Sequence, residues 1–85
     1  MAEHPLGTRE YMTKVAEGRH PGTVSIIRQF AWGHLPEKLQ AISRPCADLA
    51  IQTMRLTPDG PELTAGLRKL LEAKDCFVRA ALDVE

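Results

Sequence analysis

Apolar residues recur along this chain at spacings of three and four, which is the period of an α-helix. Nowhere do β-branched and aromatic residues alternate with polar ones, as a half-buried strand requires. Proline and glycine divide the sequence into four pieces, 8–16, 23–33, 36–56 and 61–82. The pattern therefore predicts an all-α fold in which one or two short helices within 1–33 precede two long helices.

The piece from 36 to 56 has the most regular periodicity. Apolar residues and one threonine follow each other along it at alternating spacings of four and three, as in a packing seam: Leu35, Leu39, Ile42, Cys46, Leu49, Thr53 and Leu56. Pro45 removes a backbone hydrogen bond from this helix, but the seam stays in phase on both sides of it. We therefore expect one bent helix rather than two separate ones.

A tight turn joins this piece to the last one. Asp59 or Gly60 can cap the final helix, and Pro61 suits its first position. Two long helices joined by so short a turn predict an antiparallel αα-hairpin over 35–84. The apolar residues of the final helix form two stripes: Leu63, Leu67, Leu70, Phe77 and Leu67, Leu71, Val78, Leu82. Because one neighbouring helix cannot cover both stripes, the amino-terminal helices, a second subunit or both must do so.

Length limits the chain to a single domain over 1–85, with little stability of its own. At 85 residues the free energy gained by apolar burial is about equal to the cost of ordering the chain. Cys46 and Cys76 have no zinc-ligand spacing, and the hairpin places Cys46 opposite residues near 71, too far from Cys76 for a disulfide. The expected source of further stability is therefore another copy of the chain.

Charge and targeting signals narrow the classes of partner. The 11 basic and 11 acidic residues balance, and the isoelectric point is about 6.8, whereas duplex nucleic-acid binders are usually strongly basic. No uncharged run approaches the length of a membrane span, and the amino end lacks a secretory pattern. We therefore expect a cytosolic protein whose partners include neither a membrane nor duplex nucleic acid.

Residues with enzyme or metal chemistry do not form a recognisable pattern. His4, His20 and His34 stand in or beside proline and glycine breaks, without a triad or metal-ligand spacing. His34 is expected to act as a local cap or at the surface. The sequence thus predicts a protein that is not an enzyme and needs no cofactor.

Phe30 and Phe77 are expected to lie in the core, whereas the other two aromatic residues stand close to cations. Tyr11 lies between Arg9 and Lys14, and Trp32 lies four residues after Arg28. An aromatic ring can stack on a nucleotide base while an arginine binds its phosphate. Packing of Trp32 in the core and a solvated Tyr11 would explain the same residues, so the sequence leaves both interpretations open.

Arg68 and Lys69 differ from the other charges of the final helix. Most of those charges alternate in sign at spacings that favour ion pairs on a solvated face. Arg68 and Lys69 are adjacent and have no carboxylate one turn earlier. In an oligomer they could converge on a small anion.

The segments from Phe30 to Ala80 read FAWGHLPEKLQAISRPCADLAIQTM and then PDGPELTAGLRKLLEAKDCFVRA. They combine an F-x-aromatic followed by His and Pro, a long helix, a turn with Pro-x-x-x-E, and a closing helix with L-x-E-A. In these features the chain resembles the phage anti-CBASS cyclic-oligonucleotide sponges, whose helical hairpin is shared with the anti-Thoeris sponges. Gln29 and Ala31 stand where that family often has lysine and threonine, which leaves the identity of the ligand open.

The resemblance implies a non-enzymatic phage protein that forms dimers and hexamers. Such a protein traps cyclic dinucleotide or trinucleotide signals between its subunits, in the cytoplasm of the infected bacterium. The residues expected to bind the ligand here are Tyr11, Arg28, Trp32, His34, Arg68 and Lys69. The alternative is a structural or adaptor protein that docks its surplus apolar face on a larger partner and binds no small molecule.

Overall fold

The computed structural model describes residues 4–82 and contains four helices in that range. They are α1 (Arg9–Val15), α2 (Pro21–Arg28), α3 (Glu37–Leu56) and α4 (Pro61–Ala81). No strand occurs among the described residues, so the prediction of an all-α fold is confirmed.

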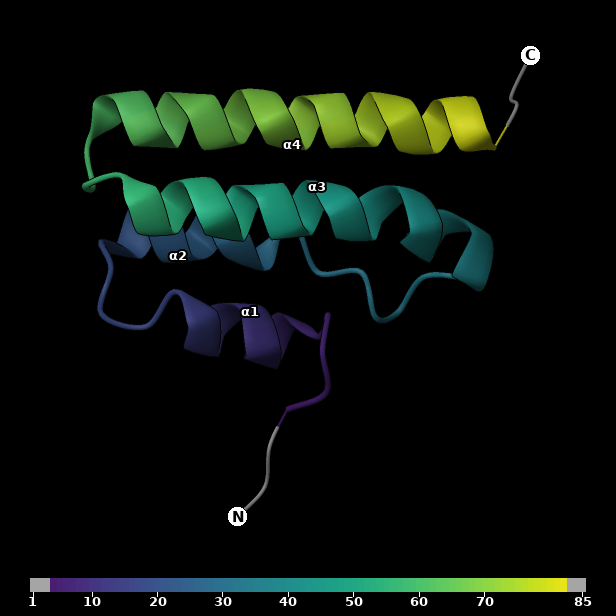
Figure 1. Ribbon diagram of the computed structural model, residues 1–85, viewed down its shortest axis with the longest axis horizontal. Coiled ribbons are helices and arrows are strands. Elements are labelled where there is room, and N and C mark those ends of the chain that lie inside the picture. The colour runs from purple at the N-terminus through teal and green to yellow at the C-terminus, as the bar shows by residue number, and fades with distance from the viewer. Residues whose placement is uncertain (1–3, 83–85) are drawn as a thin grey trace.

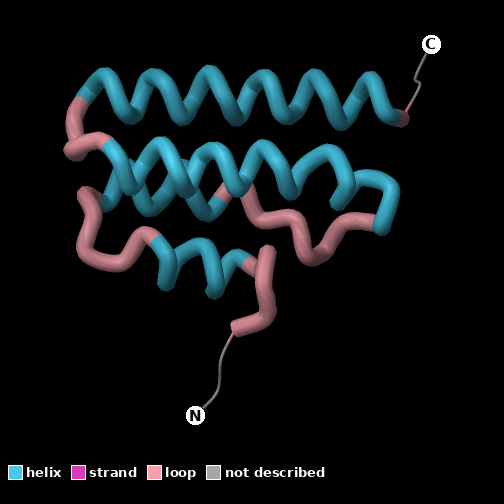
Figure 2. Tube along the Cα trace, in the orientation of Figure 1, coloured by secondary structure: helices cyan, strands magenta, loops and turns pink. Residues whose placement is uncertain are grey.

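The long helices α3 and α4 run side by side in opposite directions, joined by the turn at 57–60 (Figure 1). The short helix α2 contacts α1, α3 and α4. Figure 2 shows α1 on the far side of α2 from α4, so that the amino-terminal helices cover only one side of the α3–α4 pair. The other side of this pair has no neighbour among the described residues.

Local sequence explains where α2 and α4 begin. Each helix has a proline at its first position, where the missing N–H would have no partner in the helix. The His20 side chain caps α2, because its Nδ1 accepts a hydrogen bond from the Gly22 N–H at 3.0 Å. The predicted start of this helix at Thr23 is therefore wrong by two residues, whereas the predicted start of α4 at Pro61 is confirmed.

Helix α3 continues through Pro45, as predicted. Pro45 is exposed, so its ring occupies the solvent side of the helix rather than the core. Figure 1 shows the first turns of α3 leaning away from the line of the remainder. One bent helix therefore spans both sides of the proline.

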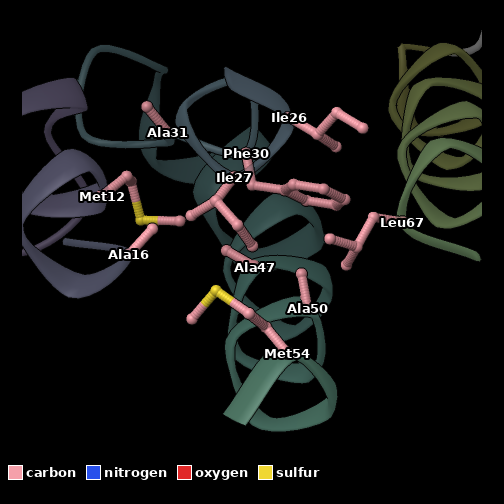
Figure 3. Packing of buried hydrophobic residues seen from close by; sticks show 10 residues of the cluster. All are labelled: Met12, Ala16, Ile26, Ile27, Phe30, Ala31, Ala47, Ala50, Met54 and Leu67. Atoms are coloured by element: carbon pink, nitrogen blue, oxygen red, sulfur yellow. The ribbon is translucent and has the colours of Figure 1, made fainter. Parts of the chain in front are cut away.

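The core lies where α2 meets the other three helices. Phe30, two residues after the end of α2, is 1% exposed, which confirms its prediction as a core residue. Figure 3 shows Ile27 of α2 pointing onto Ala47 of α3. The cluster consists of Met12, Ala16, Ile26, Ile27, Phe30, Ala31, Ala47, Ala50, Met54 and Leu67.

The predicted packing seam of α3 is wrong in phase by one residue. Of its members only Leu39 is buried, while Leu49 is 46% exposed and Leu56 is 76% exposed. The buried positions of α3 are Leu39, Ser43, Ala47, Ala50 and Met54. Small side chains on this side let α2 approach closely, so the larger leucines fall on the side that α2 leaves open.

The wide apolar face of α4 is likewise only partly covered. Leu67 is 2% exposed and belongs to the core. Phe77, predicted as a core residue, is 55% exposed, and Leu82 is 52% exposed. The prediction for Phe77 is therefore wrong, because α1 and α2 together do not reach this part of α4.

Candidate functional site

A cleft runs between α2 and α4. It consists of two adjoining hollows of about 460 Å³ and about 360 Å³, and Thr64 and Arg68 line both of them. The first hollow lies where both helices begin, and the second follows the two helices away from that end. We call this site the α2–α4 cleft, defined by His20, Thr23, Ser25, Gln29, Thr64 and Arg68.

The guanidinium of Arg68 is the cationic group of this cleft. Arg68 is exposed, and within residues 4–82 it forms no ion pair and no hydrogen bond through its side chain. Two carboxylates, of Glu72 and Asp75, line the second hollow, and Asp75 is paired with the Lys74 Nζ at 2.8 Å. The first hollow has no acidic lining residue, and the Asp59 carboxylate that accepts from the Thr23 hydroxyl at its edge is paired with Arg19. Of the two hollows it therefore suits an anion better.

The start of α4 adds to this preference for negative charge. Gly60 and Pro61 line the first hollow, and α4 has no side-chain cap at its amino end. The first N–H groups of a helix lack partners within the helix and carry the positive end of its dipole. Of the residues of α4 that line the first hollow, Pro61 has no N–H and the Thr64 N–H donates to the Gly60 carbonyl at 3.1 Å, so the start of α4 favours an anion there through its dipole.

An ion pair between Arg19 and Asp59 holds the start of α2 against the α3–α4 turn. Arg19 Nη2 lies 3.1 Å from Asp59 Oδ1, and the same guanidinium donates to the carbonyls of Met54 and Thr57 at 2.7 and 2.8 Å. The carboxylate also accepts from the His20 N–H at 3.0 Å. These bonds cap the end of α3 and the start of α2 together, and so fix one wall of the α2–α4 cleft.

The pKa of Asp59 is lowered from its ordinary value of 3.8, first by the His20 N–H and then by Arg19. A lowered folded-state pKa stabilises the protein above the unfolded-state pKa, and this stabilisation is lost as the pH falls through the folded-state pKa. We therefore expect Asp59→Asn to melt several degrees below the parent at pH 7, with the gap closing as the pH falls below about 4.

Thermal unfolding followed by circular dichroism from pH 7 to pH 2 measures this gap. Asp48→Asn, at an exposed position of α3, is the matched control and should melt like the parent throughout. If the difference in melting temperature between Asp59→Asn and the parent stays constant with pH, the role assigned to the Asp59 charge is wrong.

Trp32 is held by contacts outside the α2–α4 cleft. The backbone N–H groups of Trp32 and Gly33 donate hydrogen bonds to the carbonyl of Gly7, at 2.8 and 2.9 Å. The Gly7 backbone also packs against the indole, since a Cβ on Gly7 would lie 2.5 Å from ring atoms. The guanidinium of Arg44 lies over the ring, 4.9 Å from its centroid, where it occupies a face on which a base would have to stack.

The other expected binding residues also lie outside this cleft. Tyr11 is half-buried and packs against the core from α1, and Arg28 is exposed at the last position of α2. His34 is exposed in the loop before α3 and does not cap that helix. Lys69 is exposed but points about 100° around α4 from Arg68. Of the six predicted residues, the structure places only Arg68 in the cleft.

The two cysteines form no disulfide within residues 4–82. Cys46 and Cys76 are both free thiols. Burial raises the pKa of Cys46, and the nearby Lys74 partly offsets this effect. Residues 4–82 contain no group of three His, Cys, Asp or Glu side chains placed to hold a metal ion, and no helix there is long and apolar enough to cross a membrane.

Comparison of the chain with protein-family models, with curated proteins and with solved structures finds no match in any of the three. The chemistry of the site therefore follows from its own groups. These are the guanidinium of Arg68 and the hydroxyl of Ser25, which can donate hydrogen bonds, and the positive end of the α4 dipole. Such a set favours a ligand with anionic oxygen atoms.

Proposed function

We propose that this protein sequesters a cyclic di- or trinucleotide without cleaving it, as a homodimer or homohexamer in the cytoplasm of a phage-infected bacterium. The observation that carries the proposal is the guanidinium of Arg68, which has no ion pair within residues 4–82 and lies in a cleft where α4 begins. The resemblance of residues 30–80 to the anti-CBASS sponges supports the same ligand class. The protein would thereby remove an immune signal from solution.

The cleft has groups for two parts of a nucleotide. In the first hollow, Arg68 and the start of α4 would bind a phosphate. In the second hollow, Ile26 and Leu71 provide an apolar wall for a base. The two volumes, about 460 and 360 Å³, lie within the usual range of roughly 300–1,000 Å³ for small-molecule sites.

Each subunit has one hollow with a cationic group, Arg68, whereas a cyclic dinucleotide has two phosphates. A symmetric oligomer presents the same cleft twice or more, so its symmetry would match that of the ligand. The remaining candidate residues lie outside their own subunit's cleft and would reach the ligand from a neighbouring subunit. These residues are Tyr11, Arg28, Trp32 and His34, whereas Lys69 stands on the edge of α4 that carries Gly66.

Replacing Arg68 by alanine is expected to weaken binding at least tenfold. A charge-assisted hydrogen bond to a phosphate contributes about 1.5–3 kcal/mol, and removal of an exposed arginine should leave the fold intact. Isothermal titration calorimetry with a panel of cyclic di- and trinucleotides measures the effect. Circular dichroism verifies that the variant is folded.

Arg55→Ala is the matched control, because Arg55 is also exposed but lies on α3 outside the cleft. This variant should bind like the parent. If the parent binds none of the nucleotides, the proposed function is wrong. If Arg68→Ala and Arg55→Ala bind equally well, the assignment of the phosphate site to Arg68 is wrong.

A second candidate function is that of an adaptor that docks on a larger protein and binds no nucleotide. The observation that favours it is the apolar side of the α3–α4 pair, where Leu49, Leu56 and Phe77 are about half or more exposed. Such a protein would show no heat of binding with any cyclic nucleotide. It would also remain monomeric at high concentration, since the apolar side would be reserved for the partner.

A further inference from the structure

An apolar groove of about 510 Å³ lies between α3 and α4, at the end of the pair where the turn joins them. Its floor and walls come from leucines of both helices and from the exposed Gly66. On α4, Arg68 and Leu71 border the α2–α4 cleft, whereas Gly66 lies about half a turn around the helix from Arg68. The groove and the cleft therefore open on different sides of α4.

Gly66 has no explanation within a single chain. It stands in the interior of α4, where glycine is less favourable than alanine, and a Cβ built on it meets no atom within 4 Å. A glycine at such a place permits the close approach of another backbone. Small residues recur from it every seven positions, with larger apolar residues three positions before each: Leu63 and Gly66, Leu70 and Ala73, Phe77 and Ala80.

Two opposite charges stand on the same edge of α4 as Gly66. Glu62 and Lys69 are exposed and seven residues apart, which separates them by about 10.5 Å along the helix. Neither forms an ion pair within residues 4–82. A two-fold axis halfway between them, beside Gly66, would bring Glu62 of each copy to Lys69 of the other. A parallel copy in register would instead oppose like charges.

We propose that a second copy of this chain docks on the groove, with α4 antiparallel to α4 of the first copy and the two-fold axis beside Gly66. With this axis, residues 61–70 of α4 lie opposite residues 70–61 of the second copy's α4, an overlap of about 15 Å. The inference rests on the homo-oligomer of the proposed function and specifies one contact between its subunits, on the side of α4 away from the α2–α4 cleft.

Exchanging the charges of Glu62 and Lys69 tests the docking without any nucleotide. Sedimentation equilibrium of the full chain should show at least a dimer. Glu62→Lys and Lys69→Glu should each raise the dimer dissociation constant about tenfold or more, because each variant opposes like charges twice. The double variant restores both pairs with exchanged signs, so it should associate within about threefold of the parent.

Two further variants separate the interface from general effects of charge and fold. Gly66→Leu places bulk at the two-fold axis and should weaken association, while the open space around Gly66 leaves the single chain folded by circular dichroism. Arg55→Glu makes the same kind of charge change outside the groove and should associate like the parent.

A parent that stays monomeric at high micromolar concentration overturns the docking, as does a double variant that associates as weakly as the single ones. Both results differ from a failure of the proposed function. A monomer that binds a cyclic nucleotide refutes only the docking. A dimer that follows the charge-exchange pattern but binds no nucleotide refutes only the ligand.

Discussion

Replacing Phe30 by alanine is expected to lower the free energy of unfolding by about 3–5 kcal/mol. The side chain is 1% exposed, and its ring points from the end of α2 toward Leu67 of α4 (Figure 3). It thus joins the two helices that form the α2–α4 cleft. A domain of this size has a total stability of about 4–13 kcal/mol, so the variant should lose a large share of it. Urea unfolding followed by circular dichroism measures the difference.

Phe77→Ala is the matched control, because the sequence places both phenylalanines in the core but the structure leaves Phe77 55% exposed. At a protein concentration below that of association, this variant should lose no more than about 1 kcal/mol. Equal losses for the two variants would mean that the observed packing of α4 is wrong. A loss confined to Phe30→Ala would support the observed exposure of Phe77 on α4.

The ends of α1, α3 and α4 were predictable to within one residue because their causes are local, whereas α2 runs from Pro21 to Arg28 and not over the predicted 23–33. Pro61 needs no N–H partner at the first position of α4, and Thr8 caps α1 by accepting from the Tyr11 N–H at 3.1 Å. The side that α3 turns to the core was not predictable in the same way. Periodicity favoured the large Leu49, whereas contact with α2 selected the small Ala47, and that contact joins elements distant in sequence.

The candidate site was predictable only in part. The absence of a carboxylate one turn before Arg68 identified it as a free cation, and its side chain indeed has no ion pair in the described range. Helical spacing linked Arg28 to Trp32, but α2 ends at Arg28, so a spacing of four no longer places the two residues on one face. The ion pair of Arg19 with Asp59 spans 40 residues, and no local pattern indicates it.

Replacing Gly7 by alanine is expected to lower the free energy of unfolding by about 2–4 kcal/mol, from two separate causes. The φ angle of Gly7 is 81°, which is unfavourable for any residue with a side chain, and the new Cβ would lie 2.5 Å from the indole of Trp32. Gly18 separates these causes, since its φ is 89° and the space around it is open. Gly18→Ala should therefore lose only the backbone share, about 1–2 kcal/mol.

Fluorescence shows which role Trp32 has, because it is the single tryptophan of the chain. If the indole is a packed structural group, Gly7→Ala should displace it and shift its emission to longer wavelength, while Gly18→Ala should leave the emission unchanged. If Trp32 is instead free to stack on a base, it can move aside without loss, and the two variants should lose equal stability. The contacts of the ring with Gly7 and Arg44 favour the first result. In that case the base-stacking role would fall to Tyr11 of a neighbouring subunit and to the apolar wall of the α2–α4 cleft.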